Sequence, residues 1–245
     1  MIMHIKLPHL KRLLTLIFIL STLLSCATVS EESKLKEAES HYKLAISHME
    51  EGEYQPAFVE LQKALKINPG DKYVYYALGI IYHYFGDISK SEESLKNAIA
   101  IDPEYSEALN MLGIVYMKTG RWDSAIESFK RALGNTLYAH PEKAFANLGL
   151  AYYRKGNLKE AIRAFKSSLK RMPDFHVAYY GLALCYNAMD RYGAASEALN
   201  EAIKYDPEIK GDRNRAREVL LKKKLGTTDR REERDYRDFI EILHY

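Results

Sequence analysis

Between Lys72 and Pro207 the chain repeats one pattern of small and aromatic residues about every 34 residues. Each unit has a leucine, then a glycine or alanine, then a tyrosine at positions i, i+1 and i+4, as in Leu78, Gly79 and Tyr82. Most units close on a proline, and a weaker copy precedes them. Since this spacing puts one small residue beside two large ones on one helix face, the repeat predicts stacked pairs of helices.

The period and pattern resemble the tetratricopeptide repeat. Gly86, Gly120 and Gly156 fall where the turn between paired helices needs a left-handed residue. One unit cannot bury its own apolar face, so neighbouring units must stack. The expected fold is therefore all-α: a right-handed superhelical solenoid of about five helix pairs over residues 36–207, with C-terminal capping helices over 208–245.

The N-terminal residues 1–25 read as a lipoprotein signal peptide. Lys6, Lys11 and Arg12 precede an apolar run that is too short for a stable membrane span. The run ends in Leu23-Leu24-Ser25-Cys26, which resembles a bacterial lipobox. The resemblance implies cleavage before Cys26 and a lipid anchor on its sulfur, with acyl chains such as palmitate. A plain secretory signal is the alternative.

Residues 26–35 would then be the lipidated cysteine and a short linker that keeps the first repeat close to the membrane. Ala27, rather than an aspartate, follows the cysteine. In enterobacteria this pattern implies the outer membrane, so we expect a protein that is lipid-anchored at the periplasmic face of that membrane. The other cysteine, Cys185, is expected to be a small buried core residue.

Charge composition argues against nucleic acid as a partner. The chain has 36 Lys and Arg against 33 Asp and Glu, and the signal peptide holds three of the bases and none of the acids. The remaining chain is therefore balanced, and a balanced chain gives no electrostatic footprint for nucleic acid.

The repeat period stretches to 36 residues between the units that begin at Ser106 and Glu142. The inserted segment reads Asn135-Thr136-Leu137-Tyr138-Ala139-His140-Pro141-Glu142, and Asn147-Leu148-Gly149-Leu150 follows. With the lipobox, this segment resembles the type IV pilus biogenesis and stability lipoproteins of the PilF/PilW kind. Thr136 stands where that family often has proline. Five good repeats are present where six are usual, and the segment after Pro207 is the place for a degenerate sixth. The resemblance implies a pilotin-like protein that helps secretin subunits assemble at the outer membrane.

The candidate partner-binding residues are those at the places of each unit's first helix that face the concave side in this repeat class. They are Tyr42, Tyr73, Tyr76, Ile80, Tyr84, Asn110, Ile114, Met117, Leu150, Tyr153, Arg154, Tyr180 and Leu184. Isoleucine or leucine at the ninth place predicts an apolar floor, and tyrosine suits protein recognition. The alternative is that these residues pack on the linker or on the C-terminal tail folded back into the groove.

The tail carries a basic stretch that includes Arg213, Arg215, Arg217 and Lys222-Lys223-Lys224. A second helix follows with Tyr236, Phe239, Ile240 and Leu243 on one face. Two amphipathic helices are suited to cap a solenoid. Contact of the basic stretch with anionic lipid headgroups or peptidoglycan is the alternative.

No catalytic, metal or cofactor site is predicted. The eight histidines are scattered without zinc-binding spacing, and nucleophile elbows and phosphate-binding loops are absent from the sequence. We therefore expect a non-enzymatic scaffold that binds protein rather than a small molecule. Besides assembly of the pilus secretin, an envelope adaptor that recruits peptidoglycan enzymes remains open, as does a part of another outer-membrane assembly or export machine.

Overall fold

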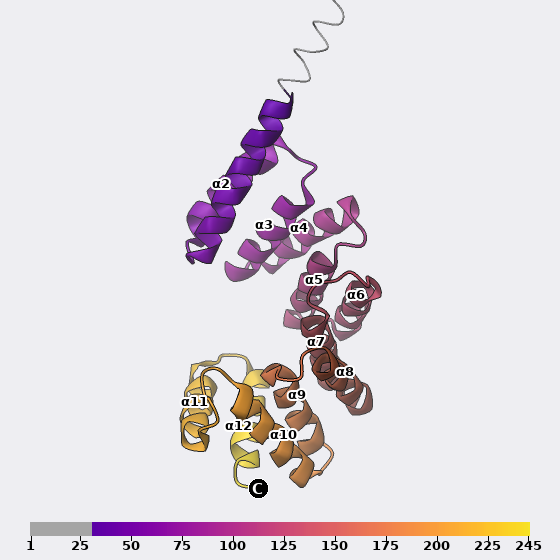
Figure 1. Cartoon of the computed structure of the whole chain (residues 1–245), viewed down its shortest axis with the longest axis vertical. Helices are drawn as coiled ribbons and strands as arrows, with labels where there is room; N and C mark the ends of the chain where they lie inside the picture. Colours follow the sequence, from indigo (N-terminus) through magenta and orange to yellow (C-terminus); the bar gives the residue numbers. More distant parts are fainter. Residues whose placement is uncertain (1–30) are drawn as a thin grey trace, which may run out of the picture.

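The computed structural model describes residues 31–245, and the regular elements in that range are all helices (Figure 1). A first helix covers residues 31–50. The others are α2 (Tyr54–Ile67), α3 (Lys72–Tyr84), α4 (Ile88–Ile101), α5 (Ser106–Lys118), α6 (Trp122–Gly134), α7 (Pro141–Arg154), α8 (Leu158–Arg171), α9 (His176–Asn187), α10 (Tyr192–Tyr205), α11 (Arg213–Gly226) and α12 (Arg230–Ile242). The predicted signal peptide and Cys26 lie outside the described residues. Within residues 31–245, the helices are too short or too polar to cross a membrane.

Consecutive helices form five antiparallel pairs, and the pairs stack in chain order along a curved rod (Figure 1). The first helix pairs with α2, followed by the pairs α3–α4, α5–α6, α7–α8 and α9–α10. This arrangement confirms the predicted all-α solenoid.

The turn inside each pair needs one residue in the left-handed conformation. Gly52, Gly86, Gly120 and Gly156 supply it with φ values between 73° and 85°. The fifth pair has Asp190 at the same place, with φ 57°. Aspartate tolerates this region better than most residues because its short polar side chain bonds locally, and here its carboxylate accepts a hydrogen bond from the Tyr192 hydroxyl at 2.9 Å.

The close packing of each pair depends on a small residue in its first helix. A Cβ added at Gly113 would lie 2.7 Å from Cζ of the buried Phe129 ring, and one at Gly149 would lie 2.8 Å from Cδ1 of Phe165. Gly79 faces Leu95 in the same way. These contacts confirm the predicted role of the small position, because a methyl group there would push the second helix away.

The inserted segment between α6 and α7 is held by its own residues. Tyr138 is buried and packs with Leu109, Ala132 and Ala144. The side-chain amide of Asn135 donates to the backbone carbonyl of Glu104 at 3.3 Å, and its oxygen accepts from the backbone N–H of Leu137 at 2.9 Å. The insertion thus joins two repeats without opening the core. Leu137 at its tip is 89% exposed.

The tail is more than a cap at the end of the solenoid. Helix α12 contacts both α9 and α10. Its buried residues Phe239 and Ile242 belong to the same hydrophobic cluster as Leu182 and Leu199 of the last pair. In α11, Ala216 and Leu220 add to that cluster. The C-terminal helices therefore extend the core and turn it back along the solenoid (Figure 1).

The Gly113–Phe129 contact gives a direct test of the packing. We expect Gly113→Ala to lower the free energy of unfolding by roughly 1–3 kcal/mol, because the buried ring must shift to admit the new methyl group. Urea denaturation followed by circular dichroism measures this change. Gly193→Ala is the matched control, since nothing lies within 4 Å of its added Cβ; its unfolding free energy should stay the same or rise. Equal effects of the two changes would contradict the packing argument.

Candidate protein-binding groove

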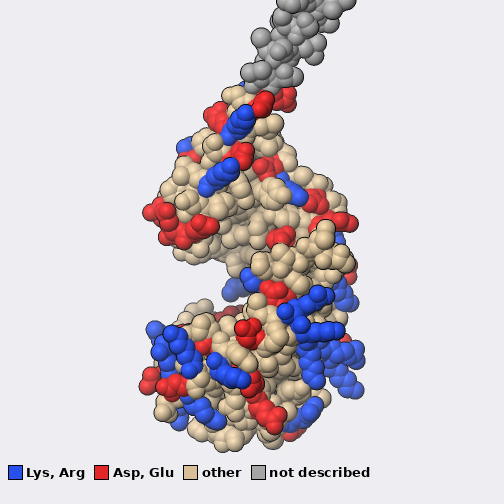
Figure 2. Space-filling view, in the orientation of Figure 1, with Lys and Arg blue, Asp and Glu red and all other residues tan. Residues whose placement is uncertain are grey.

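The first helices of the pairs line one hollowed side of the molecule, between the N-terminal repeats and α11–α12 (Figure 2). The predicted groove residues Tyr73, Ile80, Ile114 and Leu150 lie on α3, α5 and α7. Except for Leu184, all of the predicted residues keep some solvent exposure. They fall into two groups, because the tail covers only one end of the groove.

The N-terminal end of the groove is an open aromatic surface. The Tyr73 ring lies 6.4 Å from the ring of Tyr42 and 5.6 Å from the ring of Tyr105, which in turn lies 5.3 Å from Tyr76. Tyr73 is 48% exposed, whereas Tyr105 is buried. Burial raises the pKa of Tyr42, Tyr76 and Tyr105 above that of a free phenol, so these side chains stay neutral. Tyr105 was not predicted, because it precedes its helix and falls outside the repeat pattern.

Tyr84, which follows on α3, is 62% exposed and stacks on Tyr54 with ring centroids 3.8 Å apart. Phe85 next to it is 42% exposed. Monomeric proteins seldom expose neighbouring aromatic rings without using them. This edge therefore continues the open aromatic surface.

The middle of the groove combines an apolar floor with a few polar groups. Ile80, Ile114 and Met117 are each partly exposed. Beside them, burial and then the nearby Lys118 lower the pKa of His83, which keeps its imidazole neutral at pH 7. The Asn147 side-chain amide donates to the Asn110 carbonyl oxygen at 3.1 Å. Asn147 was not among the predicted residues.

The C-terminal end of the groove is occupied by the chain itself. Arg154 of α7 makes a bidentate ion pair with Asp235 of α12, in which one guanidinium nitrogen lies 2.8 Å from carboxylate oxygen Oδ1. The two side chains are only 13% and 12% exposed. Burial raises the pKa of Asp235, and Arg154 opposes that rise. Because the pKa of Asp235 is raised above the ordinary value of 3.8, ionisation of this buried carboxyl costs folding stability as the pH rises past that value. The ion pair with Arg154 offsets part of this cost.

Three more predicted groove residues lie under or beside the tail. The Tyr180 ring lies 5.0 Å from Phe239, and its hydroxyl donates to Asp206 at 2.9 Å. Burial raises the pKa of Tyr153 to about 12. Leu184 is 4% exposed, so the expectation that it offers surface to a partner is wrong. The physical reason is the apolar face of α12, which is better buried on these repeats than left in water.

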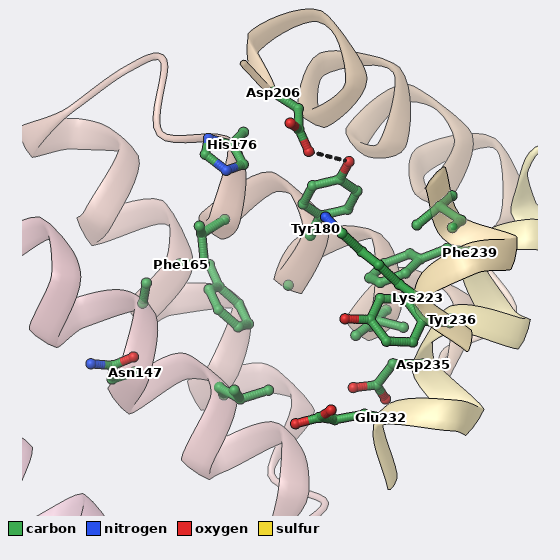
Figure 3. A pocket seen from close by; sticks show the side chains of 16 residues that line it. Asn147, Phe165, His176, Tyr180, Asp206, Lys223, Glu232, Asp235, Tyr236 and Phe239 are labelled. Carbon is green, nitrogen blue, oxygen red and sulfur yellow. Dashed lines mark hydrogen bonds between the residues drawn. The ribbon is translucent and has the colours of Figure 1, made fainter. Parts of the chain in front are cut away.

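A cavity of about 330 Å³ remains between α12 and the repeats (Figure 3). Its apolar lining includes Phe165 and Tyr180 on one side and Tyr236 and Phe239 of α12 on the other. Lys223, Glu232 and Asp235 lie along its edge, and Lys223 is paired with Glu208 at 2.9 Å. The tail thus rests on the groove without filling it.

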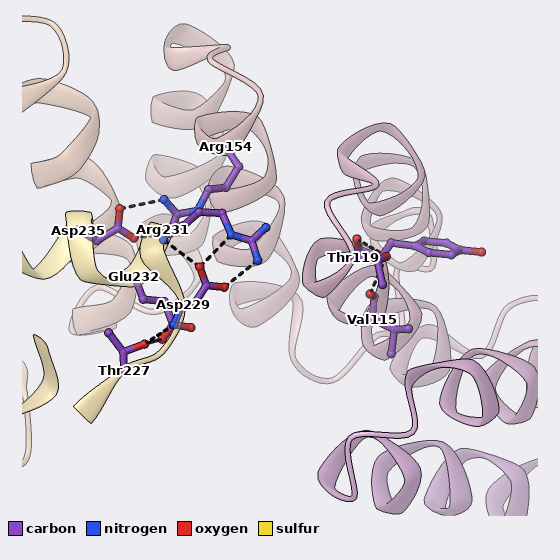
Figure 4. A network of polar contacts seen from close by, with 9 residues as sticks. Val115, Thr119, Arg154, Thr227, Asp229, Arg231, Glu232 and Asp235 are labelled. Atoms are coloured by element: carbon purple, nitrogen blue, oxygen red, sulfur yellow. Dashed lines mark hydrogen bonds and ion pairs between the residues drawn. The ribbon is translucent and has the colours of Figure 1, made fainter. Parts of the chain in front are cut away.

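The start of α12 is fixed by a polar network (Figure 4). Asp229 caps the helix by accepting from the backbone N–H of Arg231 at 2.8 Å, and it also binds the guanidinium of that arginine. These bonds hold the pKa of Asp229 well below its usual range. The Thr227 hydroxyl donates to Glu232 at 2.7 Å. The Arg231 guanidinium also lies 5.3 Å from the ring of Trp122 on α6, so α12 reaches the middle of the solenoid.

Cys185 and the turn around His48 carry groups that could in principle react or bind a metal. Cys185 is fully buried, and burial raises the pKa of its thiol to about 12, as expected for a core residue. His48, Glu51 and Glu53 place ligand atoms within 4.8 Å of one another. However, they lie at an exposed turn, and His48 is already hydrogen-bonded to Glu53 at 2.8 Å. The hydrogen bond accounts for the proximity of these groups, and we assign no metal to the cluster.

Comparison with known families finds four matches, all to models of the same repeat. Models described as tetratricopeptide repeat match residues 38–71, 73–105, 104–174 and 152–220. The chain belongs to the tetratricopeptide-repeat family. The last match extends into α11. Comparison with curated proteins finds no match.

Solved structures of tetratricopeptide-repeat proteins have the same fold. PilW, described as a widely conserved type IV pilus biogenesis factor, is 22% identical over 84% of this chain and 90% of its own, with a TM-score of 0.68. PilF of Pseudomonas aeruginosa is 21% identical over 84% of this chain and 98% of its own, with a TM-score of 0.65. YrrB, described as having an unusual peptide-binding site, is 22% identical over 79% and 97%, with a TM-score of 0.58.

The single tryptophan reports whether α12 is docked. Asp235→Asn removes the charge that holds Arg154, and breaking a buried pair costs roughly 3 kcal/mol. We expect α12 to loosen, so that Trp122 loses its contact with Arg231 and becomes more accessible to acrylamide quenching. Glu233→Gln, an exposed change on the same helix, should leave quenching unchanged. Unaltered quenching and thermal stability in Asp235→Asn would show that this pair does not hold the tail.

Proposed function

We propose that this protein is a membrane-anchored, non-enzymatic scaffold that assists assembly of a type IV pilus secretin in the outer membrane, in the manner of a pilotin. The observation that carries the proposal is the open aromatic and apolar surface over the first three repeats. It offers the groove residues Tyr73, Ile80 and Tyr84 to a partner, while α12 covers the opposite end of the groove.

The shape and chemistry of that surface support protein binding. Tyrosine rings combine a large rigid apolar face with a polar hydroxyl at the tip, and such residues dominate the energetics of protein interfaces. A concave floor of isoleucine and methionine suits an amphipathic helix or an extended segment.

Two further features support the choice of the pilus secretin as partner. Cys26 stands at the end of a lipobox-like sequence, and the segment from Asn135 to Glu142 resembles the insertion of the PilF/PilW lipoproteins. In addition, PilW, one of the structures that share the fold, is described as a type IV pilus biogenesis factor.

Deleting the gene should abolish the secretin multimers that resist heat and detergent, while secretin monomer persists on an immunoblot. The intact gene should restore multimers. A variant with Tyr73→Ser, Ile80→Ser and Tyr84→Ser should not, because it removes the open apolar surface. A control with Val59→Ser and Ile101→Ser, exposed on the second helices α2 and α4, should restore them. Normal multimers in the deletion strain would instead favour an adaptor for peptidoglycan enzymes or another export machine.

Cys26→Ala tests the anchor separately. If Cys26 carries the lipid, the variant should move from the outer-membrane fraction to the soluble periplasmic fraction, since the acyl chains provide most of the membrane affinity. Metabolic labelling with palmitate should be lost in the same variant. Cys185→Ala is the matched control and should keep both the label and the membrane fraction. A Cys26→Ala protein that remained labelled would refute the lipobox interpretation.

A further inference from the structure

The outer face of α8 carries a continuous stripe of positive charge. Lys159, Arg163, Lys166 and Lys170 are all exposed and are spaced at i, i+4, i+7 and i+11. At 3.6 residues per turn these four side chains fall within an arc of about 60°, so they project in one direction. In Figure 2 basic side chains gather over α8, on the edge of the molecule opposite the groove.

The other repeats provide an internal comparison. The same four places hold Ser89, Glu93, Lys96 and Ala100 in α4, Asp123, Glu127, Lys130 and Gly134 in α6, and Gly193, Glu197, Asn200 and Lys204 in α10; in α2 they hold Gln55, Val59, Gln62 and Lys66. Each of these helices has one cation, whereas α8 has four. The stripe is therefore a feature of this one repeat and does not follow from the needs of the fold.

Little in the protein neutralises the stripe. Within residues 31–245, Lys159, Lys166 and Lys170 have no ion pair, and Arg163 makes only an exposed contact of 3.4 Å with Glu160. Exposed pairs of this kind contribute little. Lys130 and Arg131 of α6 and Arg171 at the end of α8 are also exposed.

The basic helix of the tail is different. The six cations of α11 point in three directions: Arg213, Arg217 and Lys224 fall within an arc of about 40°, Arg215 and Lys222 lie on the opposite side, and Lys223 lies between them. One of them, Lys223, pairs with Glu208 at 2.9 Å, and another, Arg213, donates to the backbone carbonyl of Leu243 at 2.7 Å. Because Arg213 is engaged in this bond and Lys224 is only partly exposed, no direction on α11 presents four exposed cations as α8 does. Of the two basic helices, α8 is the one that presents a flat array to an outside surface.

We infer that the outer face of α8 binds an anionic membrane surface. A ridge of cations has no walls that could enclose a polypeptide segment, whereas a layer of anionic headgroups can meet all four side chains together. The long stems of lysine and arginine let their charges reach such a layer. Each basic residue near an anionic surface adds to the attraction. Contact through this face would point the groove away from the bilayer, and the inference does not depend on the identity of the groove's partner.

The test uses residues 27–245, which include every described helix and lack Cys26. Vesicles of phosphatidylcholine, with and without phosphatidylglycerol, are sedimented with this protein. We expect binding only to the anionic vesicles, and we expect added salt to weaken it. Replacing Lys159, Arg163, Lys166 and Lys170 with glutamine should lower the membrane partition coefficient on the order of 1,000-fold. Circular dichroism melting confirms that the variant is folded.

The matched control removes the same charge from α11, through glutamine at Arg215, Arg217, Lys222 and Lys224. It should bind the anionic vesicles almost as well as the unchanged protein. Equal losses in both variants would mean that net charge alone drives binding, and a larger loss in the control would assign the membrane contact to α11. In another outcome, the protein fails to sediment with the anionic vesicles but is retained by an immobilised acidic polypeptide, and retention is lost in the α8 variant. That result would mean that the α8 face binds protein. Each of these results overturns the inference.

Discussion

The structure depends on the contact between a small residue in the first helix of each pair and a large side chain in the second. Gly113 against Phe129 and Gly149 against Phe165 bring the paired helices so close that no methyl group fits between them. That closeness leaves each pair thin, with an apolar face that only the next pair can cover. Stacking follows from this requirement, and the concave groove follows from stacking. The ring of Phe165 on α8 also fills the space beside Gly181 on α9, the first helix of the last pair, so this one ring joins two repeats.

The groove is divided by the tail. Over the first three repeats it is open and aromatic, and burial keeps Tyr105 and His83 uncharged at pH 7. Over the last two repeats α12 takes the place that a partner helix would take, through the Arg154–Asp235 pair and the Tyr180–Phe239 contact. The tail thus shows that this concave surface accepts an amphipathic helix. The same mode of contact supports a helical or extended partner segment at the open end.

Opposite faces of the solenoid differ in their chemistry. The concave side presents aromatic rings and short polar groups, whereas the convex side of the fourth repeat presents four exposed cations, of which only Arg163 has an ion-pair contact, an exposed one with Glu160. Aromatic surface suits a defined protein partner, and a charged ridge suits an extended anionic layer. A protein with these two faces can lie on a membrane and keep its groove free.

The sequence by itself determined the helix pairs, their number, the turn glycines and the apolar floor, because each depends on spacings within one repeat of about 34 residues. It also placed Tyr236, Phe239, Ile240 and Leu243 on one face of the last helix. It could not say what that face covers. Only the tertiary structure decided that α12 lies in the groove, that Leu184 is buried and that Tyr105 and Asn147 belong to the site. The reason is physical: these facts depend on contacts between residues far apart in the chain, such as Arg154 and Asp235, and local periodicity holds no information about them.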